Sequence, residues 1–167
     1  SKKHVVSVEV TSKKKTWSAT KFSGQDTQAE FYHHDGTSVT TSFLRYPLEN
    51  FYVSSHFSLN RKHPIYHTRR PHYGVDLAAP RGTKVWSTAK GKVIFMGTKG
   101  GYGKVIIVQH GQHYRTVYAH LSGFRRGLSV GSSVDQKQVI GYVGSTGAAT
   151  GAHLHYEIRR DGQPQNP

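Results

Sequence analysis

The chain has 167 residues, enough for one domain with a buried core and an additional segment. Its 23 lysine and arginine residues outweigh 9 aspartate and glutamate residues, and the net charge of +14 favours acidic partners such as nucleic acid or carboxylate-bearing polymers. There is no cysteine, which excludes disulfides and thiolate metal sites, and no apolar run is long enough to span a membrane. With 18 glycines, 10 tyrosines and few helical patterns, the composition predicts a mainly β protein.

The N-terminal stretch predicts part of a small β domain. Valines alternate along residues 4–10, which is typical of a strand. Asp35-Gly36 lies between two β-prone runs and indicates a hairpin, because glycine accepts the positive φ of a tight turn. We therefore expect residues 1–45 to form a partial accessory β domain, with a hinge at the proline-containing segment 46–48.

Two passages of the C-terminal part share one pattern. Each begins with glycine, a small residue, any residue and valine, at 82–85 and 131–134, and leads into a strand-like run, at 91–95 and 139–144. This weak repeat predicts a duplicated hairpin motif with a return inside each passage. Residues 46–167 are accordingly expected to form one sheet-rich domain.

The histidines of this domain fall into different contexts. Residues 116–120 alternate in polarity, and the spacing puts Tyr118 and His120 on one face of a strand. His120 is thus a candidate for a functional face. His110 and His113 flank a glycine-containing turn, and we expect both to be exposed and without function.

The most informative stretch is His153-Leu-His-Tyr-Glu-Ile158, in which polar and apolar residues alternate strictly. On a strand, His153 and His155 point to one face, which we expect to face solvent, while Leu154 and Tyr156 point to the other. Two such imidazoles form a candidate ligand or acid–base pair, although a chance pair of surface histidines has the same pattern.

A second informative stretch contains His72 and Asp76. Pro71 and Gly74 argue against a helix there, so we expect a turn that runs into a strand. Asp76 stands between Val75 and Leu77, and a carboxylate that enters a core needs a cation or several donors, unless it only caps its own turn.

These residues together form a candidate metal site. His72, Asp76 and either His153 or His155 give two nitrogen ligands and one oxygen ligand, which leave a fourth tetrahedral position for water, as in catalytic zinc sites. The same set could hold ferrous iron, but zinc suits hydrolysis without a redox partner. The remaining histidines could supply a base for the water and a donor to the oxyanion.

The motifs resemble those of the lysostaphin-type zinc metalloendopeptidases, which cut peptide crosslinks in bacterial peptidoglycan. The resemblance covers about residues 46–167 and depends on three motifs in order. They are His72-Tyr-Gly-Val-Asp76, Tyr118-Ala-His120-Leu and Gly151-Ala-His153-Leu-His155. It implies an antiparallel β fold with a groove flanked by loops. The junction before this domain looks like that of Gram-negative murein DD-endopeptidases.

Carried over to this chain, the resemblance implies specific roles. His72, Asp76 and His155 would bind one zinc ion, and His120 and His153 would be the catalytic histidines. The implied substrate is the peptidoglycan peptide stem, with D-alanyl–diaminopimelate bonds as the cleaved crosslinks. A periplasmic or envelope location follows from that substrate. Because the chain starts at Ser1 without Met or a secretion signal, we expect any signal or anchor segment to lie outside it.

Two other functions and one further site are compatible with parts of the sequence. A family member without activity could bind the cell wall or activate an amidase, but retention of all five residues argues against it. A nucleic-acid binder would explain the charge, yet no nucleic-acid motif is recognisable. In the basic loop 58–70, Arg69 and Arg70 are candidates for binding substrate carboxylates, with a merely solvated loop as the alternative.

Overall fold

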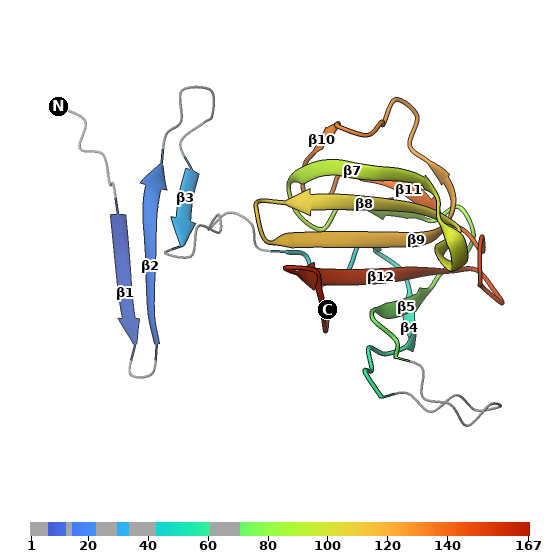
Figure 1. The fold of residues 1–167 in the computed structure, drawn as a ribbon, viewed down its shortest axis with the longest axis horizontal. Helices are drawn as coiled ribbons and strands as arrows, with labels where there is room; N and C mark the ends of the chain where they lie inside the picture. The colour runs from blue at the N-terminus through green and yellow to red at the C-terminus, as the bar shows by residue number, and fades with distance from the viewer. Residues whose placement is uncertain (1–6, 13–14, 23–29, 34–42, 61–70) are drawn as a thin grey trace. The chain divides into compact units, whose positions relative to one another are not determined.

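The computed structural model describes residues 7–12, 15–22, 30–33, 43–60 and 71–167 (Figure 1). The predicted turn at Asp35-Gly36 and the arginines Arg69 and Arg70 lie outside the described residues. The chain divides into two compact units, Ser1–Ser42 and Phe43–Pro167, which are described separately below.

The described part of the first unit is a three-stranded antiparallel sheet. Strands β1 (Ser7–Ser12), β2 (Lys15–Phe22) and β3 (Glu30–His33) pair in the order β1-β2-β3. The strand predicted within residues 4–10 therefore contributes to β1. That residues 1–45 are an accessory domain stays a prediction.

The second unit is one antiparallel sheet of ten strands (Figure 1). Its main path runs β10-β7-β8-β9-β12-β5-β4, while β11 pairs with β6 and β9, and β13 pairs with β12. The strands are β4 (Tyr52–Ser55), β5 (Val75–Ala78), β6 (Lys84–Trp86), β7 (Gly91–Thr98), β8 (Lys104–His110), β9 (Tyr114–Phe124), β10 (Ser133–Val134), β11 (Val139–Val143), β12 (His153–Arg160) and β13 (Gln163–Gln165). A 3-10 turn, η1 (Gly100–Tyr102), joins β7 to β8. The predicted antiparallel β architecture is thus confirmed.

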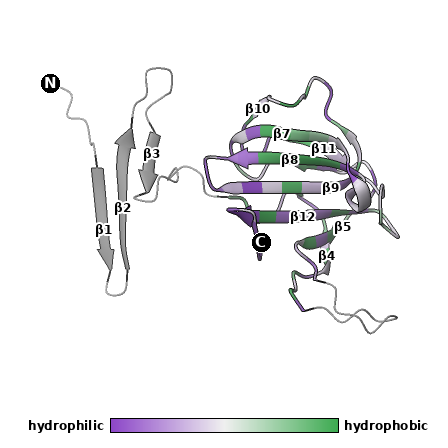
Figure 2. Ribbon diagram, viewed as in Figure 1, coloured by the Kyte–Doolittle hydropathy of each residue, from purple (hydrophilic) through white to green (hydrophobic). Residues whose placement is uncertain are grey.

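The main core lies on one face of this sheet. Leu77, Tyr118, Leu154 and Tyr156 are fully buried there, with hydrophobic residues of β6, β7, β8 and β11 around them. Figure 2 shows how hydrophobic positions recur along β7 and β8 among hydrophilic ones. Each fully buried leucine contributes about 1.5–3 kcal/mol relative to an exposed one, so this face anchors the strands that carry the candidate site. A smaller cluster on the other face contains Val105, Val117 and Ala119.

The two repeated passages form strands, but they do not fold back on themselves as expected. β6 pairs with β11, and β10 pairs with β7, so each passage pairs with the other one. Val85, Val93, Val134 and Ile140 from the two passages are all buried in the main core. The pairing between the two passages thus brings apolar side chains of all four strands into one core.

The segment expected to be a hinge is packed into the second unit instead. Leu48 is buried, and the rings of Tyr46 and Phe51 stack edge to face at 5.0 Å. Trp86 donates its backbone N–H to the Pro47 carbonyl at 3.1 Å. These contacts tie the segment to β6, because Pro47 still offers its carbonyl even though it lacks an N–H.

Within the part of the chain that the structure describes, no helix is long and apolar enough to cross a membrane.

Candidate metal centre

Three neighbouring strands place the candidate residues. β12 pairs with β5 so that His155 lies opposite Asp76, and it pairs with β9 so that His155 also lies opposite Ala119. Figure 1 shows β12 running beside β9, with β5 on its other side. His72 precedes β5 as expected, but it forms an isolated antiparallel bridge with Ser58, through two backbone hydrogen bonds of 2.7 and 3.0 Å, rather than a turn.

The side chains of His72, Asp76 and His155 converge. Asp76 Oδ1 lies 3.1 Å from His72 Nε2 and 2.8 Å from His155 Nδ1, and these two nitrogens are 3.2 Å apart. A tetrahedral ion with bonds of about 2.0–2.1 Å needs ligand atoms about 3.3 Å apart. The three atoms are therefore close to the arrangement that zinc requires, and nitrogen and carboxylate donors suit its chemistry.

The outer nitrogens of both imidazoles are held by acceptors. His72 Nδ1 donates to the His56 carbonyl at 2.8 Å, and His155 Nε2 donates to Glu157 Oε1 at 2.9 Å. Without a metal, His72 Nε2 and His155 Nδ1 face Asp76 Oδ1 at hydrogen-bond distance, and with these outer bonds in place both nitrogens would be the atoms that turn to a metal ion. Such outer partners are typical of histidines that bind metals.

Electrostatics keep Asp76 ionised. Burial alone would raise its pKa, but hydrogen bonds with His155 and His72 outweigh burial and hold it well below its usual range. For His155, burial lowers the pKa, yet the bonds with Asp76 and Glu157 outweigh it and raise that pKa to about 9. A cation that binds these atoms must therefore displace a proton from His155.

His120 reaches this face through a break in the strand alternation. Strict alternation from Tyr118 would send His120 into the main core, where Tyr118 and Leu121 are buried. The β8–β9 register instead sets Ala119 and His120 opposite Val105 alone, and His120 has φ +59°. This bulge turns His120 toward β12, so the expected face is correct although the alternation that suggested it fails.

The two further histidines lie beside the three-atom cluster. The ring centroid of His120 is 4.7 Å from that of His153 and 6.0 Å from that of His155. His120 Nδ1 donates to the Thr146 carbonyl at 2.8 Å, which leaves Nε2 available for a proton. Burial lowers the pKa of His120, although the bond to Thr146 opposes it. A neutral imidazole with a free Nε2 can act as a base.

His153 and His155 share a face as predicted, but that face is largely covered. His155 is only 7% exposed, and its ring lies under the other imidazoles rather than in solvent. His153 Nδ1 donates a hydrogen bond to the Gly151 carbonyl at 2.9 Å, and His153 Nε2 is 3.8 Å from Asp76 Oδ1. The geometry of His155 with Asp76 is therefore tighter than that of His153.

The exposure predicted for His110 is wrong. The residue is 2% exposed. Its ring nitrogens form hydrogen bonds with the Lys90 carbonyl at 2.8 Å and with Thr116 Oγ1 at 2.7 Å. Its ring centroid lies 5.0 Å from that of Phe43. Burial lowers its pKa, so it is a neutral core histidine. His113 is only partly exposed, rather than fully exposed as expected, and pairs with Asp161 at 2.8 Å.

Sequence reasoning missed the residues behind His155. Glu157, Tyr102 and Arg159 form a hydrogen-bonded cluster that contacts His155 Nε2 through the Glu157 carboxylate. The available signal was a carboxylate two residues after His155 on the same strand face.

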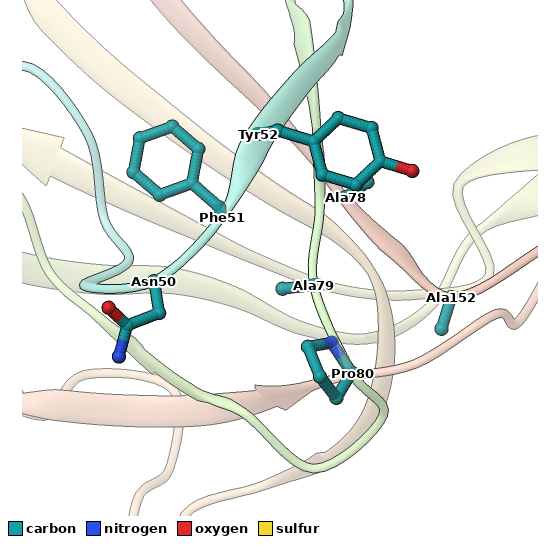
Figure 3. Close-up of a pocket in the computed structure, with 7 residues that line it drawn as sticks. All are labelled: Asn50, Phe51, Tyr52, Ala78, Ala79, Pro80 and Ala152. Carbon is teal, nitrogen blue, oxygen red and sulfur yellow. The ribbon is translucent and has the colours of Figure 1, made fainter.

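A pocket of about 410 Å³ lies where the start of β4, the end of β5 and the residue before β12 meet (Figure 3). It is lined by Asn50, Phe51, Tyr52, Ala78, Ala79, Pro80 and Ala152. Ala78 is the register partner of His153, and Ala152 precedes it. The pocket lining is mostly apolar and contains none of the candidate ligands.

The sheet and the histidine–carboxylate cluster together define a metallopeptidase type of site. Residues 70–167 match the sequence profile of Peptidase family M23. The chain is 50% identical over 121 residues to "DD-carboxypeptidase/endopeptidase Mpg" of Neisseria meningitidis, covering 72% of this chain and 27% of that protein. It is 38% identical over 138 residues to "Peptidoglycan DD-endopeptidase ShyA" of Vibrio cholerae, covering 82% and 32%. The chain thus spans about a third or less of these relatives.

Solved structures of peptidases have a similar fold. A zinc-containing peptidase from Vibrio cholerae superposes with a TM-score of 0.75 at 32% identity, over 98% of this chain and 49% of that one. The lysostaphin catalytic domain from Staphylococcus simulans superposes with a TM-score of 0.62 at 30% identity, over 71% and 90%. The chain belongs to peptidase family M23, which confirms the family expected from the motifs.

Proposed function

We propose that this chain is a zinc-dependent endopeptidase that hydrolyses peptide crosslinks of bacterial peptidoglycan, at D-alanyl–diaminopimelate bonds. The observation that carries the proposal is the convergence of His72, Asp76 and His155, with His120 and His153 beside them. The relatives named as peptidoglycan DD-endopeptidases support the substrate class.

In this proposal His72 Nε2, Asp76 Oδ1 and His155 Nδ1 hold one zinc ion. Zinc at such a site lowers the pKa of water to about 7 and polarises a carbonyl. No cysteine competes for the ion. Three protein ligands leave room for substrate, which a closed structural site does not.

The two other histidines have different tasks: His120 transfers the proton and His153 stabilises negative charge. The lowered pKa and free Nε2 of His120 suit it to take a proton from the attacking water. His153 then stabilises the developing oxyanion from the adjacent position. As the C–N bond breaks, the proton held by His120 passes to the leaving amine, so the products are a carboxylate and an amine.

The proposal also covers the location of the protein, its domains and two basic residues. We infer a periplasmic or envelope location, because that is where peptidoglycan is found. Residues 1–45 would be part of an accessory domain, and 46–167 the peptidase domain. Arg69 and Arg70 would bind stem-peptide carboxylates.

Digestion of purified peptidoglycan tests the function. The zinc-loaded chain is incubated with sacculi, and mass spectrometry identifies the new amino and carboxyl termini. The proposal predicts a new D-alanine carboxyl terminus and a free diaminopimelate amine, and loss of both after chelation. A chain that purifies without zinc, and that binds sacculi but does not cut them when zinc is supplied, would support the alternative, a silent cell-wall binder or amidase activator.

A further inference from the structure

Glu157 is a buried carboxylate that the proposed mechanism does not use. It is 1% exposed, and it follows His155 by two positions on β12, so both side chains leave the same face of the sheet. Its Oε1 accepts a hydrogen bond from His155 Nε2 at 2.9 Å. The Tyr102 hydroxyl donates to the same oxygen at 2.8 Å. An ionised carboxylate at this depth needs such donors.

The other carboxylate oxygen is held as well. Arg159 Nε donates to Glu157 Oε2 at 2.6 Å, and Arg159 Nη2 donates to the Tyr102 hydroxyl at 3.1 Å. Tyr102 and Arg159 therefore contact each other as well as Glu157. A carboxylate bound at both oxygens cannot rotate away from His155 without losing charge-assisted hydrogen bonds.

The backbone at Gly74 packs closely against Tyr156 and Glu157. A Cβ on Gly74 would lie 2.3 Å from the Tyr156 carbonyl and 2.9 Å from Glu157 Cγ. The Tyr102 ring lies 5.9 Å from the His155 ring and packs against the cluster that contains Ala119. His155 is thus enclosed on the side away from Asp76.

We propose that Glu157 is a positioning residue of the metal centre, which keeps the proton of His155 on Nε2 and so presents Nδ1 to the metal, with Tyr102 and Arg159 holding the carboxylate. The inference depends on the proposed role of His155 as a ligand. An imidazole that carried its proton on Nδ1, or that turned in its plane, would lose the ligand atom that faces Asp76.

Zinc affinity of the whole chain, measured by competition with a chelator, tests this role. Glu157→Gln keeps the size of the side chain, but its amide group must face either the donors His155 and Tyr102 or the donor Arg159. We expect the Kd for zinc to rise about 10- to 100-fold. Tyr102→Phe removes one neutral hydroxyl, and we expect a rise of about 3- to 10-fold.

Asp161→Asn is the matched control. Asp161 follows β12 and contacts His113 at 2.8 Å, so the change removes the same type of carboxylate–imidazole contact at an exposed place. We expect its zinc affinity to equal that of the wild type. Circular dichroism at the assay temperature verifies that every variant is folded.

A second readout separates positioning from stability. The nitrogen NMR signals of His155 in the zinc-loaded wild type should show the metal on Nδ1 and the proton on Nε2. Zinc on Nε2 would overturn the proposal, as would an unchanged Kd in a folded Glu157→Gln whose thermal stability alone has fallen. If Glu157→Gln does not fold, Tyr102→Phe and the wild-type spectrum decide. A wild type that binds no zinc refutes the proposed function itself, not only this role.

Discussion

Gly103→Ala should damage the reaction without removing the metal. Gly103 has φ +62° and ψ −138°, a combination that costs other residues about 1–3 kcal/mol. A Cβ there would lie 2.3 Å from the carbonyl carbon of Thr146 and 2.5 Å from its oxygen. That oxygen accepts the proton of His120 Nδ1 at 2.8 Å. The added methyl group must push the Thr146 carbonyl away, and His120 loses the partner that orients it.

The expected loss follows from the displacement. A shift of about 1 Å in a catalytic group can lower the rate about 100-fold. We therefore expect kcat/KM on a crosslinked peptide to fall about 10- to 100-fold, together with a loss of about 1–3 kcal/mol in the free energy of unfolding. Zinc content should remain that of the wild type, because the three atoms closest to a Cβ on Gly103 all belong to Thr146 and not to a candidate ligand.

Gly111→Ala serves as the matched control for Gly103→Ala. Gly111 also has a positive φ, +57°, but a Cβ there meets nothing within 4 Å. Its variant should lose some stability and keep its kcat/KM. The reasoning is refuted if both variants lose activity equally, or if Gly103→Ala keeps full activity with the same stability loss as Gly111→Ala.

Three further outcomes are expected. His155→Ala should lose zinc, whereas His153→Ala should retain zinc and lose turnover; equal metal loss in both would make His153 a ligand. Replacing buried, neutral His110 by Gln should remove a pH dependence of stability. Because burial lowers the folded pKa of His110 below its ordinary 6.5, the wild type loses stability as pH falls below about that value. The stability advantage of wild type over His110→Gln should therefore shrink from pH 8 to pH 5 in thermal unfolding, and a constant difference contradicts this. Replacing Arg69 and Arg70 by Ala should lower kcat/KM on peptidoglycan at low salt, less so at high salt, with zinc content unchanged; unchanged kinetics would leave only a solvated loop.

The polarity pattern of the last long strand predicted its two faces correctly. Leu154 and Tyr156 are buried in the main core, and His153 and His155 lie on the other face. The pattern did not predict which strands pair with one another. Pairing of β12 with β5 puts His155 opposite Asp76, and such register depends on contacts between residues far apart in the chain.

Other features could not be predicted from the sequence, because they depend on contacts between residues that are far apart in the chain. The bulge at His120 depends on the fit of β9 to β8. The exchange of partners between the repeated passages depends on burying their valines together. His110 lies next to a turn, yet Phe43, distant in sequence, packs against its ring. No short window of sequence contains these contacts.

Zinc content measured side by side in purified wild type, Asp76→Ala and His120→Ala tests the central claim most directly. Asp76 Oδ1 touches both candidate nitrogens, at 3.1 and 2.8 Å, whereas His120 is held by Thr146 and has no assigned bond to the metal. The account predicts about one zinc per chain in the wild type and in His120→Ala, and almost none in Asp76→Ala. Metal retained by Asp76→Ala and lost by His120→Ala would contradict it.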